Sequence, residues 1–188
     1  LFANVREQFG GNLKLIVCGG SNLDQDYIDF FDNIGINVVH GYGITECSPL
    51  LSANPDCCKK RYSVGPVVSC CQVKVDNSQN YGCYNGHEVG EIMAKGDNIM
   101  LGYYNDTQGT REVMKGEWFK TGDIGYIDED NYLFITGRVK NLIILANGKN
   151  VSPENLESRL NKIDVIKEVV VSSRKINGSE HILATIFC

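Results

Sequence analysis

The sequence contains no long apolar segment, no recognisable leader and no excess of positive charge. Its apolar runs, such as residues 142–146 and 169–171, have the length of strands, whereas a membrane-spanning helix needs about 20 apolar residues. Residues 1–9 contain Arg6 and Glu7 and no apolar core, so we expect no secretory signal there. Lys and Arg number 18 against 23 Asp and Glu, a net charge of −5, which disfavours a nucleic acid partner.

The remaining composition is that of an ordinary folded chain with extra glycine. Apolar residues make up 43% and charged residues 22% of the 188 residues, values typical of globular proteins. This length predicts one domain, or one domain and part of another. Glycine occurs 20 times, which indicates many tight turns or loops whose backbone approaches a ligand.

The eight cysteines do not form a recognisable metal or disulfide pattern. There is no C-x-x-C, and His40, His87 and His181 do not stand at zinc-finger spacing. Four cysteines form two adjacent pairs, 57–58 and 70–71, and neighbouring residues rarely bridge each other. We therefore expect reduced thiols in a cytoplasmic protein, with a cysteine metal site as the alternative.

The first 40 residues predict a strand, a helix and a second strand. Residues 13–18 read as a buried strand, and residues 24–34 carry apolar side chains at helical spacing with acidic residues in the first turn. Gly35 ends that helix, and residues 36–39 read as the next strand. This order is typical of a βαβ unit, and the fold class is therefore α/β with further mixed α+β parts.

The pattern after residue 61 changes to short strands separated by turns. Apolar runs between residues 62 and 136 alternate with Gly, Asn and Asp, which predicts antiparallel β structure forming a small barrel, interrupted by a helix at 107–114. A hairpin over 142–151 should lead to a helix from Pro153. Residues 165–173 and 181–187 should form a hairpin with a turn at Asn177-Gly178. The charge balance shifts near residues 138–141, which suggests a domain boundary there.

Two glycine-bearing loops should meet at one edge of the first sheet. Gly41-Tyr42-Gly43-Ile44-Thr45-Glu46 follows the second strand, and Cys18-Gly19-Gly20-Ser21 ends the first. Ligands bind at this end of open α/β sheets, and Glu46 offers a hard carboxylate for magnesium. The alternative is an ordinary strand-to-loop turn with an exposed acid. Together the two loops predict a nucleotide pocket.

Two later segments carry charged side chains suited to a nucleotide. Asp123 follows Thr121-Gly122 and could accept both hydroxyls of a ribose; the alternative is a simple β-turn. Arg138 is a permanently charged fork suited to phosphate or ribose oxygens.

The order and spacing of these segments resemble the adenylate-forming enzymes, and within them the long-chain fatty acid–CoA ligases. The resemblance runs through essentially the whole chain and is carried by five segments: residues 19–24 (GGSNLD), 41–49 (GYGITECSP), 90–106 (GEIMAKGDNIMLGYYND), 116–128 (GEWFKTGDIGYID) and 132–157 (YLFITGRVKNLIILANGKNVSPENLE). It implies activation of a carboxylate with ATP to an acyl-adenylate, then transfer of the acyl group to coenzyme A.

The resemblance also implies roles for residues of the first half. The loop that lies against adenine corresponds to Gly19, Gly20 and Ser21. Tyr42 corresponds to the aromatic residue that packs on the adenine ring, with Gly43 allowing close approach of the backbone. Thr45 corresponds to the hydroxyl that contacts phosphate, and Glu46 to the magnesium ligand.

Five residues of the second half receive roles in the same way. Asp123 corresponds to the carboxylate that holds the ribose hydroxyls, and Ile135 to the apolar residue under the nucleotide. Arg138 corresponds to the arginine that reaches ribose or phosphate. Lys140 corresponds to the hinge about which the small domain rotates between the two reactions, and Gly148 to the glycine beside the pantetheine channel. Magnesium on Glu46 together with Arg138 would offset the charge that develops on the phosphate.

The resemblance fails in two places. Residues 1–188 contain no Ser/Thr/Gly-rich phosphate loop followed by Lys, and Lys162, Lys167 and Lys175 come too early to be the C-terminal catalytic lysine. We therefore expect an internal fragment that is inactive alone. Residues 1–139 would end the large domain, with a nucleotide-pocket part (1–60) and a barrel-like part (61–139), and residues 140–188 would begin the small α+β domain.

The expected partners are small molecules: a fatty acid, ATP and coenzyme A. Two alternatives stay open, an adenylation domain that loads a carrier protein and a non-catalytic nucleotide-binding relative. The expected location is the cytoplasm, with peripheral association with the inner face of a membrane left open. The sequence predicts neither the acyl chain length nor the oligomeric state.

Overall fold

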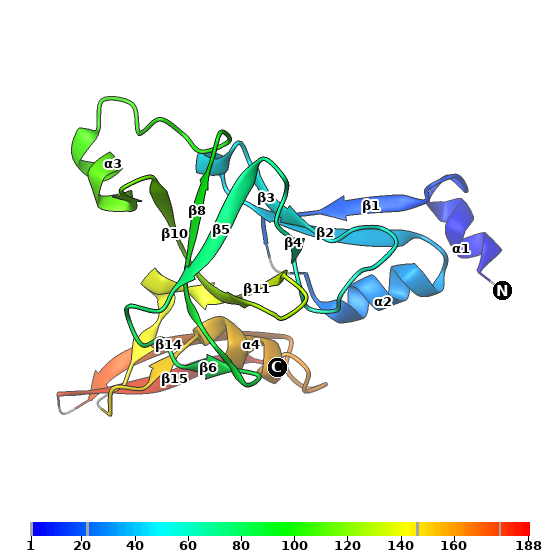
Figure 1. The fold of residues 1–188 in the computed structure, drawn as a ribbon. Helices are drawn as coiled ribbons and strands as arrows, with labels where there is room; N and C mark the ends of the chain where they lie inside the picture. Colours follow the sequence, from blue (N-terminus) through cyan, green and yellow to red (C-terminus); the bar gives the residue numbers. More distant parts are fainter. Residues whose placement is uncertain (1, 22, 146, 177) are drawn as a thin grey trace. The chain divides into compact units, whose positions relative to one another are not determined.

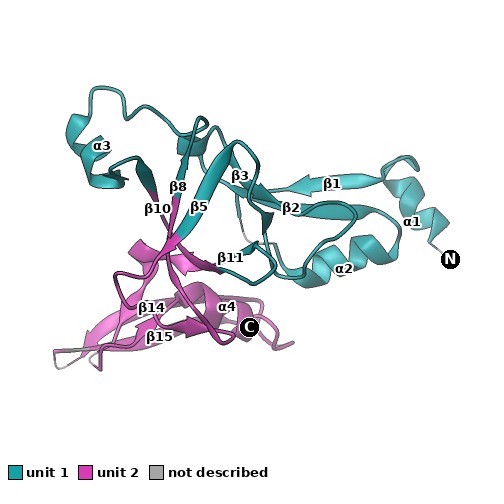
Figure 2. Cartoon of the chain, viewed as in Figure 1, with its two compact units in different colours: residues 1–74, 94–119, 127–134 teal, residues 75–93, 120–126, 135–188 magenta. Residues whose placement is uncertain are grey.

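The structure is a computed structural model that describes residues 2–21, 23–145, 147–176 and 178–188. Figure 1 shows the fold, and Figure 2 shows the two compact units into which the chain divides. Unit 1 comprises Leu1–Lys74, Ala94–Phe119 and Ile127–Phe134, and unit 2 comprises Val75–Met93, Lys120–Tyr126 and Ile135–Cys188. The domain boundary expected after residue 139 falls inside unit 2 and stays a prediction.

The predicted βαβ unit is confirmed in unit 1. Strand β1 (Leu15–Cys18) pairs in parallel with β2 (Asn37–Gly43), and helix α2 (Gln25–Asn33) connects them, as Figure 1 shows. Asp24 caps the helix, since its Oδ1 accepts a hydrogen bond at 3.0 Å from a backbone N–H of the first turn. Gly35, at φ +79°, ends the helix in a conformation that favours glycine.

Strand β1 is not buried as the sequence predicted. It lies at the edge of a sheet with the order β1-β2-β3, where β3 is Leu50–Ala53 and α1 (Ala3–Gln8) precedes β1. The side chain of Val17 is 70% exposed, whereas Val38 on the central strand is 2% exposed. An apolar run predicts a strand but does not fix its place in a sheet, so the expected burial was wrong.

The β region forms an open sheet. Its strands follow the order β4-β11-β10-β8-β5, with β9 paired to β10. Their bounds are Gly65–Pro66 (β4), Cys71–Asp76 (β5), Gly90–Gly96 (β8), Met114–Lys115 (β9), Trp118–Ile127 (β10) and Tyr132–Arg138 (β11). The path ends at β4 and β5 among the described residues, so the expected closed barrel is wrong. Turn spacing predicts antiparallel strands but not closure. Helix α3 (Thr107–Val113) occurs where it was expected.

The last part of unit 2 forms two hairpins around a helix. Strands β12 (Ile143–Ile144) and β13 (Asn150–Val151) pair antiparallel, and α4 (Pro153–Leu160) begins with its proline, both as predicted. Strands β14 (Glu168–Ile176) and β15 (Ser179–Phe187) form the second hairpin. The predicted turn residue Asn177 lies outside the described residues. A small core holds this part together, comprising Ile143, Val169 and Val171 with Leu145, Val151, Leu156, Leu160 and Ile166.

Three short elements complete the fold. Strands β6 (Cys83–Tyr84) and β7 (His87–Glu88) form a small hairpin in unit 2. Two 3-10 helices, η1 (Thr45–Cys47) and η2 (Val139–Asn141), follow β2 and β11. Among the described residues, the helices are too short or too polar to cross a membrane.

Candidate functional site

The glycine–tyrosine motif lies within strand β2 and at its end. The strand continues through Gly43 because residues 41–43 pair with β3, so the motif begins inside the strand and not after it. A Cβ on Gly43 would lie 2.0 Å from the carbonyl oxygen of Pro49. Ile44 N donates a hydrogen bond to the same oxygen at 2.8 Å, which closes a tight loop around η1. Only glycine fits this position.

The two predicted loops do lie together in unit 1. Cys18 is the register partner of His40, and a Cβ on Gly19 would lie 3.5 Å from the oxygen of Gly41. His40 Nε2 donates a hydrogen bond to the carbonyl oxygen of Ser21 at 3.1 Å. Strand β2 therefore holds the Gly19–Ser21 loop directly, through a side chain to which sequence reasoning gave no role.

His40 should make the stability of unit 1 depend on pH. Burial lowers the pKa of His40 below 6.5, although its bond to Ser21 acts in the opposite direction. The unfolded state therefore takes up a proton first as the pH falls below about 6.5, and the free energy of unfolding decreases there until the pH passes the folded pKa. Above that window the contribution is fully present.

We expect His40→Gln to abolish this part of the pH dependence, because glutamine keeps a donor but does not titrate. Urea unfolding on both sides of the window measures it. His181→Gln is the control, since His181 is exposed and should leave the wild-type profile unchanged. A wild-type profile in His40→Gln would contradict this account.

The second half of the motif is held by a segment between β8 and α3. Tyr103 OH donates to Glu46 Oε1 at 2.9 Å, and Met100 N donates to the Glu46 carbonyl oxygen at 2.7 Å. Asn98 Nδ2 donates to the carbonyl oxygens of Cys47 and Leu50 at 3.1 and 3.0 Å. Sequence reasoning missed these three residues, although the segment that contains them was one of the five that carried the resemblance.

Glu46 has the properties of a magnesium ligand. Its side chain is half-buried, and a carboxylate has about four acceptor positions, of which Tyr103 uses one. The described residues include no cluster of three or more His, Cys, Asp or Glu placed to hold a metal. A single carboxylate nevertheless suits Mg²⁺, which usually binds one or two carboxylates together with substrate phosphates. Thr45, beside it, is exposed.

The neighbouring thiol does not add a nucleophile. Burial, followed by the nearby charge of Glu46, raises the pKa of Cys47 to about 12. Since the thiolate is the reactive form, Cys47 is inert at neutral pH. The polar chemistry of this loop therefore rests on Thr45 and Glu46.

In unit 2 the structure brings Asp123 and Arg138 together. Arg138 Nε lies 2.7 Å from Asp123 Oδ1, with the two side chains 60% and 3% exposed. The backbone N–H of Asp123 donates to Thr121 Oγ1 at 3.1 Å, and Thr121 Oγ1 donates to the Ile92 oxygen at 2.8 Å. Because Gly122-Asp123 lies inside strand β10, the alternative interpretation as a β-turn is wrong. The acid is fixed, while most of the arginine faces solvent.

The other predicted residues of unit 2 lie on or after β11. Ile135 is half-buried on β11, and Lys140 is exposed in η2. Gly148, at φ +77°, occupies the turn between β12 and β13, where its N–H donates to the Leu145 oxygen at 2.8 Å. None of these positions tests the roles implied by the resemblance, and those roles stay predictions.

The segment expected to contain the hinge, η2, is tied to the start of α4. Asn141 Nδ2 donates to Glu154 Oε1, and Ser152 Oγ donates to Glu154 Oε2 at 2.7 Å. Burial acts to raise the pKa of Glu154, but these hydrogen bonds outweigh burial and lower the pKa. The carboxylate is therefore charged at neutral pH and anchors η2 to the helix. Sequence reasoning took Glu154 only as part of a helix start.

A cavity of about 80 Å³ lies within unit 2. Its walls come from β10, β11, the β6–β7 hairpin and the start of α4, and include Ile124, Gly137 and Ser152. Small-molecule sites usually measure about 300–1,000 Å³, so this cavity alone is too small for a nucleotide.

Comparisons with known proteins identify relatives of this chain. The family model described as AMP-binding enzyme matches residues 2–104. A long-chain-fatty-acid–CoA ligase of Haemophilus influenzae is 38% identical over 156 residues, 82% of this chain and 27% of that protein. An indoleacetate–CoA ligase of Aromatoleum aromaticum is 33% identical over 165 residues, 87% of this chain and 32% of that protein.

A solved structure has the same fold. The O-succinylbenzoate coenzyme A synthetase of Bacillus subtilis, in complex with ATP and magnesium, superposes with a TM-score of 0.79 at 29% identity, covering 92% of this chain and 36% of that chain. The chain thus spans about a third or less of the curated relatives that it matches. The match over more than half of its length shows that the chain belongs to the AMP-binding enzyme family.

Proposed function

We propose that the natural protein carrying this chain is a fatty acid–CoA ligase. It would join a fatty acid carboxylate to the α-phosphorus of ATP with release of pyrophosphate, and the thiol of coenzyme A would then displace AMP to give the thioester. The observation that carries the proposal is the juxtaposition in unit 1 of the Gly19–Ser21 loop and the motif that ends in Thr45 and Glu46. Relatives named long-chain-fatty-acid–CoA ligase support the substrate class.

In this proposal the residues of unit 1 bind and orient the nucleotide. Gly19, Gly20 and Ser21 would lie against adenine, and the buried ring of Tyr42 would pack on it. Thr45 would donate its hydroxyl to a phosphate oxygen, and Glu46 would hold the magnesium ion. Bound magnesium would offset the negative charge of the phosphates. The loop needs no rearrangement to present Glu46, because Tyr103 already fixes its carboxylate.

The residues of unit 2 would bind the ribose and assist the transfer. Asp123 would accept the ribose hydroxyls, with Ile135 beneath the nucleotide. Arg138 is mostly exposed and has rotatable bonds, so it can move from Asp123 to a phosphate oxygen when the nucleotide enters. Lys140 would serve as the hinge and Gly148 would line the pantetheine channel in the thioester-forming step.

Two finer points belong to this proposal. Other relatives are named for other acids, indoleacetate and O-succinylbenzoate, so the preference for long chains rests on the fatty acid ligases among them. A carrier protein in place of coenzyme A is the second candidate. The cytoplasmic location stays a prediction, and no observation supports the peripheral membrane association.

A substrate panel tests the proposal on the natural protein. Acyl-CoA formation and pyrophosphate release would be measured with fatty acids of increasing length, indoleacetate and O-succinylbenzoate, each with coenzyme A or a carrier protein as acceptor. We expect turnover to be highest with a long-chain acid and coenzyme A. Turnover only with an aromatic acid would reject the fatty acid as substrate. Turnover only with the carrier protein would reject coenzyme A as acceptor.

Tyr103 is expected to act as a positioning residue for Glu46. Burial, followed by its bond to Glu46, raises the pKa of Tyr103, so it stays a donor at neutral pH. Removing the hydroxyl in Tyr103→Phe should raise the Mg²⁺ concentration required for nucleotide binding about tenfold, with little change at saturating Mg²⁺. Tyr104→Phe is the matched control, because the adjacent ring is 94% exposed. Titration of ATP binding with Mg²⁺ measures both variants. If Tyr103→Phe and Tyr104→Phe require the same Mg²⁺ concentration, Tyr103 does not position Glu46.

A further inference from the structure

The loop between β3 and β4 carries two adjacent cysteines that face solvent together. Cys57 and Cys58 are both exposed, and their sulfur atoms lie 3.4 Å apart, within hydrogen-bonding distance. All eight cysteines of the chain are free. These two thiols are therefore accessible and point to the same place, and neither has a role in the proposed reaction.

The residues that follow the pair anchor the loop within unit 1. The next residue, Lys59, forms an ion pair with Asp32 at 2.7 Å and donates to the Val38 oxygen at 3.2 Å. Lys60 pairs with Asp128 at 2.5 Å. Exposed ion pairs contribute little stability singly. Here two ion pairs attach one short loop to α2 and to the turn before β11, and a hydrogen bond attaches it to β2. The thiols thus stand on backbone whose position is determined by several contacts.

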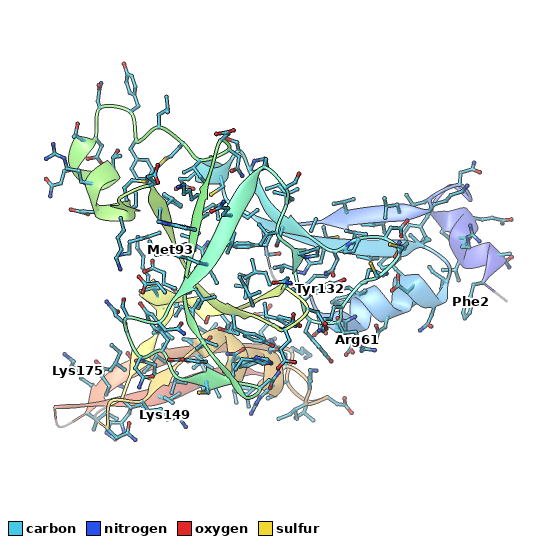
Figure 3. All side chains as sticks on the ribbon, viewed as in Figure 1. Phe2, Arg61, Met93, Tyr132, Lys149 and Lys175 are labelled. Atoms are coloured by element: carbon cyan, nitrogen blue, oxygen red, sulfur yellow. The ribbon has the colours of Figure 1, made fainter. Side chains whose placement is uncertain are left out.

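Cys58 itself is held by an aromatic residue. Tyr132 OH donates to the carbonyl oxygen of Cys58 at 2.7 Å, and Lys60 Nζ lies 5.4 Å from the centre of the same ring. Figure 3 labels Tyr132 on β11 and Arg61 in the loop. Tyr132 thus fixes the backbone of Cys58, and the 3.4 Å between the two sulfur atoms places the thiols as a pair.

The chemistry of the pair favours a soft ligand that removes both thiol protons. The hydrogen bond between the two sulfur atoms raises the pKa of Cys57, so the Cys57 thiol is protonated at neutral pH. The described residues offer no third ligand for zinc, since no group of three His, Cys, Asp or Glu is present among them. Two thiols suit a soft centre that completes its coordination with a group of its own.

We propose that Cys57 and Cys58 form a dithiol binding site for trivalent organic arsenic and chemically similar soft Lewis acids. With phenylarsine oxide, two As–S bonds form, the As–O bond and two S–H bonds break, and the oxygen leaves with both protons as water. Arsenic stays trivalent, so no oxidant or reductant takes part. The site does not depend on the proposed ligase activity.

The second adjacent pair, Cys70-Cys71, provides a control within the same chain. Cys70 is exposed, but Cys71 is buried and its sulfur lies 3.8 Å from the carbonyl oxygens of Leu51 and Val68. Adjacency in sequence is the same for both pairs, whereas joint accessibility is found only for 57–58. Binding at Cys57-Cys58 alone would therefore show that binding depends on the joint exposure of the two thiols and not on their adjacency in the sequence.

The test is titration of the chain with phenylarsine oxide, read by intact mass and peptide mapping. We expect one phenylarsenic group bridging Cys57 and Cys58, removed by ethanedithiol but not by an equivalent monothiol. Cys57→Ser and Cys58→Ser should each weaken binding about a hundredfold, because the second As–S bond is intramolecular, and Cys70→Ser should leave it unchanged. Circular dichroism checks that the variants fold. An absent adduct, an adduct mapped to other cysteines, or full binding by either serine variant would overturn the proposal.

Discussion

Replacing Asp123 with alanine is expected to lower the affinity for ATP by a factor of about 100 or more. Two hydrogen bonds from ribose hydroxyls to a carboxylate contribute about 1.5–3 kcal/mol each, and each 1.4 kcal/mol is about tenfold in affinity. The fold should survive, because the partner Arg138 is 60% exposed and its charge stays hydrated when the carboxylate is removed. Equilibrium titration of the natural protein with ATP measures the effect.

Two comparisons make the Asp123 result specific. Wild type should bind 2′,3′-dideoxy-ATP about as weakly as Asp123→Ala binds ATP, and the variant should not distinguish the two nucleotides. Glu129→Ala removes an exposed acid elsewhere and should bind like wild type. If Asp123→Ala binds ATP normally, or still distinguishes ATP from the dideoxy compound, Asp123 does not hold the ribose.

Replacing Gly43 with alanine should strongly destabilise the fold of unit 1. The added Cβ would lie 2.0 Å from the Pro49 oxygen and 2.9 Å from the Leu50 Cα, both backbone atoms that cannot turn away. Strand β2 or the loop after η1 must move, at a cost of about 3 kcal/mol. The same movement displaces Thr45 and Glu46, so ATP affinity should fall as well.

Gly19→Ala is the steric control for the Gly43 prediction. Its Cβ would lie 3.5 Å from the Gly41 oxygen, an ordinary van der Waals distance, and Gly19 does not have a positive φ. Urea unfolding should show a loss well below that of Gly43→Ala. Equal losses in the two variants would mean that the contact with Pro49 is not what requires glycine.

Local chemistry explains why much of the fold could be predicted. The acidic residues at the start of α2, Gly35 after that helix and Pro153 at the start of α4 are signals that act within a few residues, and the structure confirms each. The open path of the second sheet and the exposure of β1 depend on which strands become neighbours. No local signal carries that information, so the predictions of a closed barrel and of a buried β1 were both wrong.

The candidate site divides in the same way. The two glycine loops were expected to meet because consecutive parallel strands end at one edge of a sheet, and the register of Cys18 with His40 confirms it. Tyr103 stands 57 residues after Glu46, and Cys58 stands 74 residues before Tyr132. Contacts across such separations arise only from the folded topology. Sequence reasoning therefore missed Tyr103, which holds Glu46, and Tyr132, which holds the backbone beside the exposed thiols.

The most direct test of the proposed function is exchange of labelled pyrophosphate into ATP by the natural protein. Reversible acyl-adenylate formation predicts exchange that requires both Mg²⁺ and a fatty acid, does not require coenzyme A, and is lost in Asp123→Ala. If ATP binds but no carboxylic acid supports exchange, or if exchange requires coenzyme A, the protein does not activate carboxylates by adenylation.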